Sequence, residues 1–150
     1  AFYYSFIALS PYSLMRINPT YFYHQFVEQN FKTIYLPRKF ESISKEFLLR
    51  MNFLGKIMPP IMDIGTYFYN DKKNKVNRQF DIVTLDEKGY ISYECKFTNS
   101  KIGLDVVNEE IYQTKNLEIG FYKLGFISKN GFESDVDRAK FSCFSLDDFY

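Results

Sequence analysis

Two β-rich segments joined by a short turn limit the fold of this chain more than any other feature of its sequence. The segments are Gln79–Leu85 and Tyr90–Thr98, and the residues between them, Asp86-Glu87-Lys88-Gly89, are typical of a tight turn. If the turn is centred on this sequence, residue 85 pairs with 90, 83 with 92 and 81 with 94. The sequence therefore predicts an antiparallel β-hairpin in which Asp81 stands opposite Glu94.

Helical and strand-like segments surround this hairpin. Apolar residues recur every three or four positions between Pro37 and Gly55, which predicts an amphipathic helix: Phe40, Ile43, Phe47, Met51 and Leu54. A second helix is predicted over Gly103–Ile119, with Leu104, Val107, Ile111 and Leu117 facing inward. Further strands are predicted at Ile61–Tyr69, Phe121–Ser128 and Lys140–Ser145. The order helix, three strands, helix, strands indicates an α/β fold around a mixed central sheet.

Composition excludes several classes of protein. The chain has 150 residues, of which 46% are hydrophobic and 25% charged, as expected for one globular domain. Two cysteines, Cys95 and Cys143, are too few for a disulfide scaffold, and the single His24 has no second histidine for a zinc site. No apolar run approaches the ~18–20 residues of a membrane span, so we expect a soluble, cytoplasmic chain without membrane contact. Because it begins at Ala1, we expect a piece of a longer protein.

The charges are unevenly distributed along the chain. Residues 1–78 carry 11 Lys and Arg against 5 Asp and Glu, whereas residues 79–150 carry 8 against 13. The basic part peaks in a cluster that suits contact with the phosphates of a nucleic acid, formed by Lys72, Lys73, Lys75 and Arg78. A solvated loop is the alternative interpretation of this cluster.

The predicted hairpin also places functional groups together. Directly opposed carboxylates of Asp81 and Glu94 would have Cβ atoms roughly 4.5–5.5 Å apart and would repel each other. Lys96 lies on the same face, two residues beyond Glu94, while Cys95 points to the opposite face. Either Lys96 or a divalent cation can neutralise the pair, and oxygen ligands from Asp81, Glu94 and the backbone carbonyl of Cys95 favour Mg²⁺ or Mn²⁺. The pattern indicates metal-assisted phosphodiester hydrolysis, with a structural ion-pair cluster as the alternative.

These residues resemble the PD-(D/E)XK nuclease superfamily, in which a glutamate of the first helix joins an aspartate and a following (Asp/Glu)-x-Lys in the sheet. More narrowly, the chain resembles domain of unknown function 234, the C-terminal module of certain archaeal and bacterial ATPases. The matching segments are Phe2–Phe6, Phe40–Ile43, Lys45–Leu48, Ile64-Gly65, Phe80–Val83, Glu94–Phe97 and Ser128–Phe132. The chain departs from the superfamily pattern before Asp81, where Gln79-Phe80 replaces the proline.

The resemblance implies a restriction-endonuclease-like fold, a mixed central sheet flanked by helices. Asp81 and Glu94 would bind Mg²⁺ or Mn²⁺, Lys96 would assist the attacking water, and Glu41 would complete the catalytic site. Residues 1–37 would be an aromatic connecting segment and residues 38–150 the nuclease-type domain. The partners implied are DNA and the N-terminal, ATP-binding ATPase and winged-helix region of the same full-length protein. These residues contain no Gly-Lys-Ser/Thr phosphate-binding motif, so this piece should not itself hydrolyse ATP.

Three functions follow as hypotheses. The first is a Mg²⁺-dependent nuclease-type domain that cleaves DNA within a larger ATPase. The second is a non-catalytic module that binds DNA or a partner protein and regulates the ATPase. The third uses the aromatic residues of segment 1–37 as an interface, which leaves an oligomer open.

Overall fold

A computed structural model describes residues 18–71, 76–115, 117 and 119–150 of the chain. The chain forms two compact units, an N-terminal unit, Ala1–Lys39, and a C-terminal unit, Phe40–Tyr150. Among the helices of the described residues, none has the length and apolar character needed to cross a membrane.

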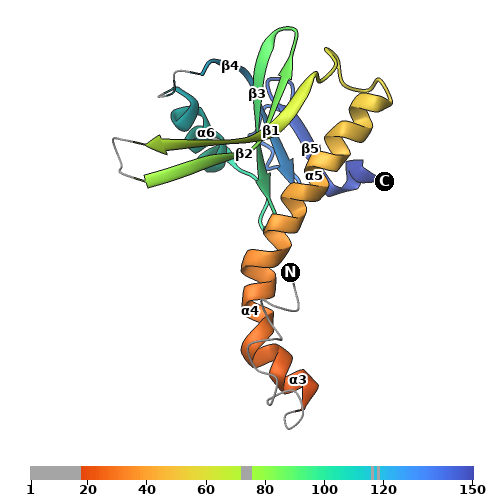
Figure 1. Cartoon of the computed structure of the whole chain (residues 1–150), viewed down its shortest axis with the longest axis vertical. Helices are drawn as coiled ribbons and strands as arrows, with labels where there is room; N and C mark the ends of the chain where they lie inside the picture. The colour runs from red at the N-terminus through yellow and green to blue at the C-terminus, as the bar shows by residue number, and fades with distance from the viewer. Residues whose placement is uncertain (1–17, 72–75, 116, 118) are drawn as a thin grey trace. The chain divides into compact units, whose positions relative to one another are not determined.

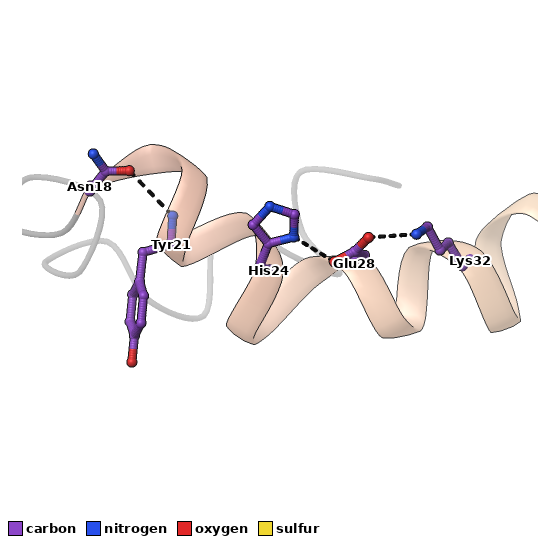
Figure 2. Close-up of polar contacts among 5 residues, drawn as sticks. All are labelled: Asn18, Tyr21, His24, Glu28 and Lys32. Carbon is purple, nitrogen blue, oxygen red and sulfur yellow. Dashed lines mark hydrogen bonds and ion pairs between the residues drawn. The ribbon is translucent and has the colours of Figure 1, made fainter.

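The described part of the N-terminal unit is helical. Its elements are α3 (Pro19–Phe22), a π-helical stretch (Tyr23–Val27), α4 (Glu28–Asn30) and a second π-helical stretch (Phe31–Tyr35). Asn18 caps the first helix, since its Oδ1 accepts hydrogen bonds from the backbone N–H groups of Thr20 and Tyr21. Further along, the Glu28 carboxylate pairs with His24 and with Lys32, one turn before and one turn after it (Figure 2).

The C-terminal unit contains a five-stranded mixed sheet (Figure 1). Its strands are β1 (Asp63–Asp71), β2 (Val76–Asp86), β3 (Gly89–Lys96), β4 (Phe121–Ser128) and β5 (Ser142–Ser145), in the order β1-β2-β3-β4-β5. Strand β2 pairs antiparallel with both β1 and β3, whereas β3, β4 and β5 are parallel. The helices are α5 (Leu36–Phe53), α6 (Leu104–Lys115) and a short 3-10 helix, Leu146–Phe149. The predicted mixed α/β class is confirmed, and the architecture is consistent with a restriction-endonuclease-like fold.

Two apolar cores form around this sheet. Phe40, Phe47 and Leu48 of α5 pack with sheet residues that share one face: Ile82, Ile91, Tyr93 and Ile127. Val107 of α6 packs with Phe126 in a separate cluster. Because Phe126 and Ile127 are neighbours on β4, their side chains point to opposite faces of the sheet. The α5 face and the α6 face are therefore two different environments for the hairpin.

The helices and strands depart from the predicted bounds mainly around α6. The helix ends at Lys115 and does not continue to Ile119, and the side chain of Leu104 is 42% exposed. Leu104 is the first residue of α6 and its side chain is exposed, so the prediction that it faces inward is wrong. Strand β1 begins two residues later than predicted, at Asp63, and β4 has the predicted bounds.

Candidate functional site

The hairpin formed by β2 and β3 has the predicted register over most of its length. Leu85 pairs with Tyr90 and Val83 with Ser92, as expected from a turn at residues 86–89. Asp86 fixes this turn, because its Oδ1 accepts hydrogen bonds from the backbone N–H groups of Lys88 at 2.7 Å and Gly89 at 3.2 Å.

The ladder ends one pair before the predicted pairing of Asp81 with Glu94, which is therefore not a ladder pair. The last pair of the register joins Ile82 to Tyr93. On the other side of β2, the pairing with β1 shifts: Gly65 pairs with Val83 but Tyr67 pairs with Phe80. One residue of β1 thus opposes two of β2, residues 81 and 82, which is a β-bulge. A bulge interrupts the ladder and redirects a side chain, and such features are common next to active sites.

Asp81 nevertheless reaches β3 through its side chain. Its Oδ2 accepts a hydrogen bond from the backbone N–H of Cys95 at 3.0 Å, and its Oδ1 accepts one from Gln79 Nε2 at 3.3 Å. Cys95 directly follows Glu94, and the Asp81 carboxylate helps to raise the pKa of Glu94. The two acids are therefore close enough to interact, although a hydrogen bond across the bulge brings them together and not a ladder pair.

Lys96 forms the ion pair of this site. Its Nζ lies 2.6 Å from Glu94 Oε1, with the two side chains 35% and 18% exposed. Burial raises the pKa of Glu94, Asp81 raises it further, and Lys96 only partly offsets these effects. Burial acts to lower the pKa of Lys96, but the charges of Glu94 and Asp81 outweigh it and the pKa is raised. Lys96 is therefore a cation that lies beside Glu94, whose ionised form is disfavoured by burial.

Cys95 and Glu41 belong to the α5 side of the hairpin. Cys95 packs against the core of the α5 face, as its predicted orientation requires. Burial raises the pKa of the Cys95 thiol, and the charges of Asp81, Glu94 and Glu41 contribute in the same direction. Glu41 of α5 thus lies within electrostatic reach of the residue between Glu94 and Lys96. Its predicted catalytic role stays a prediction.

The predicted basic cluster is described only in part. Lys72, Lys73 and Lys75 lie outside the described residues. Arg78 of β2 has its Nε 3.3 Å from Asp71 and its Nη1 4.0 Å from Glu109 of α6. The Arg78 guanidinium thus has two carboxylates of the protein as neighbours, whereas its predicted role was contact with phosphate.

The sequence analysis missed a buried acid beside these residues. Glu110 of α6 is 2% exposed, and its Oε1 accepts a hydrogen bond from the hydroxyl of Ser92, which is fully buried on β3. Burial is the largest cause that raises the pKa of Glu110, to about 7, and the charges of Glu94 and Asp81 add to it. The available signal was position: Glu110 lies three residues after inward-facing Val107 and next to Ile111, on the apolar stripe of the helix.

The donor set fits a hard divalent cation better than zinc. Within the described ranges, no three His, Cys, Asp or Glu side chains are grouped so that they alone would hold a metal ion. The predicted set needs only two carboxylates, Asp81 and Glu94, together with the backbone carbonyl of Cys95. All three donors are oxygen atoms, which Mg²⁺ and Mn²⁺ prefer. The raised pKa of Glu94 shows that more positive charge would stabilise the carboxylate form.

The fold and these residues define a class: a mixed α/β domain with interacting acids and a lysine at a bulged sheet hairpin. The chain belongs to the DUF234 family, described as archaeal and bacterial proteins of unknown function, whose model matches residues 3–119. Among solved structures it is similar to the crystal structure of protein of unknown function AF1548, at 15% sequence identity and a TM-score of 0.46. That match covers 69% of this chain and 56% of the other. No curated protein matches.

Proposed function

We propose that this chain is a nuclease-type domain of the PD-(D/E)XK kind, which hydrolyses phosphodiester bonds of DNA with Mg²⁺ or Mn²⁺ as part of a larger ATPase. One observation carries the proposal: the bulge in β2 turns the Asp81 carboxylate onto β3, beside the Glu94 and Lys96 ion pair. Acids of this kind destabilise a fold when they are buried together, so their presence at a bulge suits a catalytic site.

Each residue has a role that follows from its position. Asp81 and Glu94 would hold the metal ion with the Cys95 carbonyl. The bound ion would supply the Lewis acid that polarises the phosphoryl group and acidifies a water molecule. Lys96, a cation within hydrogen-bond distance of Glu94, would orient the attacking water and stabilise the negative charge that develops on the phosphoryl oxygens. The water oxygen would form the new bond to phosphorus and release a proton to solvent, while one P–O bond of the backbone breaks and the leaving oxygen takes up a proton from solvent.

A second function is supported by the same contacts. Lys96 already forms an ion pair with Glu94, and the Asp81 carboxylate already accepts two hydrogen bonds. Each acid thus has at least one protein partner, which suits a non-catalytic module that binds DNA or a partner and regulates the ATPase. Divalent-metal binding separates this alternative from the nuclease, because only the nuclease requires the ion.

The test is DNA cleavage by the 150-residue chain with Mg²⁺ or Mn²⁺, using supercoiled, linear and single-stranded substrates. We expect cleavage by the wild type, and a loss on the order of a hundredfold or more in Asp81→Asn and Lys96→Ala. Lys88→Ala is the matched control, because Lys88 is an exposed lysine in the turn of the same hairpin. It removes the same charge and should retain cleavage.

Two outcomes would contradict the proposal. Cleavage that survives both Asp81→Asn and Lys96→Ala would falsify the assignment of the site. Absence of cleavage and of Mn²⁺ binding in a folded wild type, with DNA binding retained, would favour the regulatory module.

A further inference from the structure

Glu110 is a buried acid that the proposed catalytic roles do not use. It lies on the inner side of α6 with 2% of its surface exposed, beside Val107, which belongs to the core of the α6 face. Acids are seldom buried so completely without a partner, and an apolar side chain would serve packing better at this position. Glu110 therefore calls for an explanation other than the hydrophobic core.

The partner of Glu110 places it behind the candidate site. The Ser92 hydroxyl donates a hydrogen bond of 2.8 Å to Glu110 Oε1. Ser92 lies two residues before Glu94 on β3, so both side chains point to the α6 face of the sheet. Lys96, two residues further on, shares this face. The contact thus holds the Glu110 carboxyl on the same face of the sheet as Glu94 and Lys96.

The groups around Glu110 leave an excess of acids. Glu94 and Asp81 raise the pKa of Glu110 and Lys96 lowers it, after burial, which is the largest effect. From β1, the Tyr69 hydroxyl also faces this region, since Glu110 contributes to the raised pKa of Tyr69. Glu109, the neighbour of Glu110 on α6, is 66% exposed and lies 4.0 Å from Arg78. On the described elements, the charge of Lys96 is thus coupled to four acids, Asp81, Glu94, Glu110 and the exposed Glu109.

We propose that Glu110 is a positioning residue for a divalent cation: held by Ser92 behind Glu94, its carboxylate supplies the negative charge that strengthens cation binding between Asp81 and Glu94. This inference rests on the proposed function and deepens it. A doubly charged ion gains twice the attraction of a singly charged ion from the same carboxylate, so Glu110 favours divalent over monovalent cations.

Glu110 acts through its electric field and is not a ligand. The described residues hold no group of three acids placed to bind one ion, and the Oε1 atom of Glu110 is engaged by Ser92. The Glu110 charge can act on the cation without contact, because the protein interior screens a buried charge weakly. Its contribution is therefore to affinity, while coordination is left to Asp81 and Glu94.

The test is Mn²⁺ titration of the full 150-residue chain by calorimetry at about pH 8, where the carboxyl of Glu110 is mostly ionised. We expect Glu110→Gln to weaken Mn²⁺ binding on the order of tenfold. Glutamine keeps the size of the side chain and an oxygen that accepts from Ser92, so it removes mainly the charge. Glu109→Gln is the matched control: Glu109 is exposed and makes the smallest contribution to the raised pKa of Glu94, so the same change there should alter the affinity less than about twofold.

The outcomes separate this inference from the proposed function. Wild type that binds no Mn²⁺ removes both. Wild type that binds Mn²⁺, with equal affinity in Glu110→Gln, removes only the role of Glu110, and so does equal weakening by Glu109→Gln. If Glu110→Gln does not fold, Ser92→Ala decides, because it removes the hydrogen bond that holds the Glu110 carboxyl and lowers its pKa, so less negative charge remains beside the cation. Weaker Mn²⁺ binding by Ser92→Ala supports the inference, and unchanged affinity overturns it.

Discussion

Glu28 and Glu94, both within the described part of the chain, each pair with a lysine, and the partner lysines differ in exposure. In the N-terminal unit, Glu28 pairs with Lys32 and His24 along a helix (Figure 2), and the side chains of Glu28, Lys32 and His24 are 27%, 61% and 56% exposed. In the C-terminal unit, Glu94 pairs with Lys96 along a strand, with side chains 18% and 35% exposed. Both pairs are short, so distance alone does not distinguish them.

The pKa shifts do distinguish them. The hydrogen bond from His24, followed by that from Lys32, lowers the pKa of Glu28, so the folded chain favours the ionised carboxylate. Burial and the neighbouring Asp81 raise the pKa of Glu94 despite its lysine. An ion pair that water solvates is an ordinary surface feature, whereas buried acids with too little positive charge oppose folding. The comparison therefore singles out the hairpin as a place where buried charges oppose folding.

Removal of the lysine should produce the largest difference between the two regions. Lys96→Ala leaves the Glu94 carboxylate half-buried beside Asp81 without its cation, and we expect a loss of ~1–3 kcal/mol in unfolding free energy. Lys32→Ala removes a lysine from the exposed pair and should leave the unfolding curve unchanged. Urea unfolding at neutral pH measures both. Equal unfolding midpoints for Lys96→Ala and the wild type would show that the hairpin pair is as well solvated as the surface pair.

The next largest effect is a gain in unfolding free energy when Glu110→Gln removes the buried carboxylate charge. The pKa of Glu110 is raised from 4.5 to about 7 in the folded chain, so the folded state binds a proton more tightly than the unfolded state. The stability that this provides is complete below about pH 4.5 and is lost as the pH rises through 7. Glu110→Gln removes this loss, so the variant should be more stable than the wild type by ~1–3 kcal/mol at about pH 8 and show little gain near pH 5.

Thermal unfolding of wild type and Glu110→Gln across this pH range measures the effect. Glu109→Gln, at an exposed position of the same helix, should show no such pH-dependent gain. A variant that is both more stable and weaker in Mn²⁺ binding would mark Glu110 as a residue kept for function. A gain of the same size at pH 5 and pH 8 would mean that ionisation of Glu110 is not its cause.

The sequence predicted the hairpin that carries the candidate site better than the contacts among its side chains. The turn residues and alternating apolar pattern were sufficient for the β2 and β3 register, because a shift by one residue would move Ile82 and Tyr93 out of the core. The bulge at residues 81 and 82 could not be predicted, since it depends on how β1 pairs with the other edge of β2. The ion pair of Glu94 with Lys96 followed from their spacing of two residues on one strand.

Glu110 shows why the rest was missed. A glutamate on the apolar stripe of a helix is visible in the sequence, but its partner Ser92 is 18 residues away and on another element. Only the packing of α6 on the sheet brings the two together. The positions of Lys72, Lys73 and Lys75 lie outside the described residues, so the predicted phosphate contacts stay a prediction.

The smallest effect on stability is expected for substitution of Glu28, whose ionised carboxylate is favoured by its two partners. Glu28→Gln removes the charge that His24 and Lys32 share (Figure 2), but both of these cationic partners are exposed to water. Exposed ion pairs contribute little to stability because side-chain entropy and solvent screening offset their attraction. We expect the thermal midpoint of Glu28→Gln to equal that of the wild type at physiological salt, with a small decrease only at low salt. A decrease as large as that of Lys96→Ala, persisting at high salt, would mean that burial does not separate the two regions, and the argument that the hairpin acids are kept for function would lose its support.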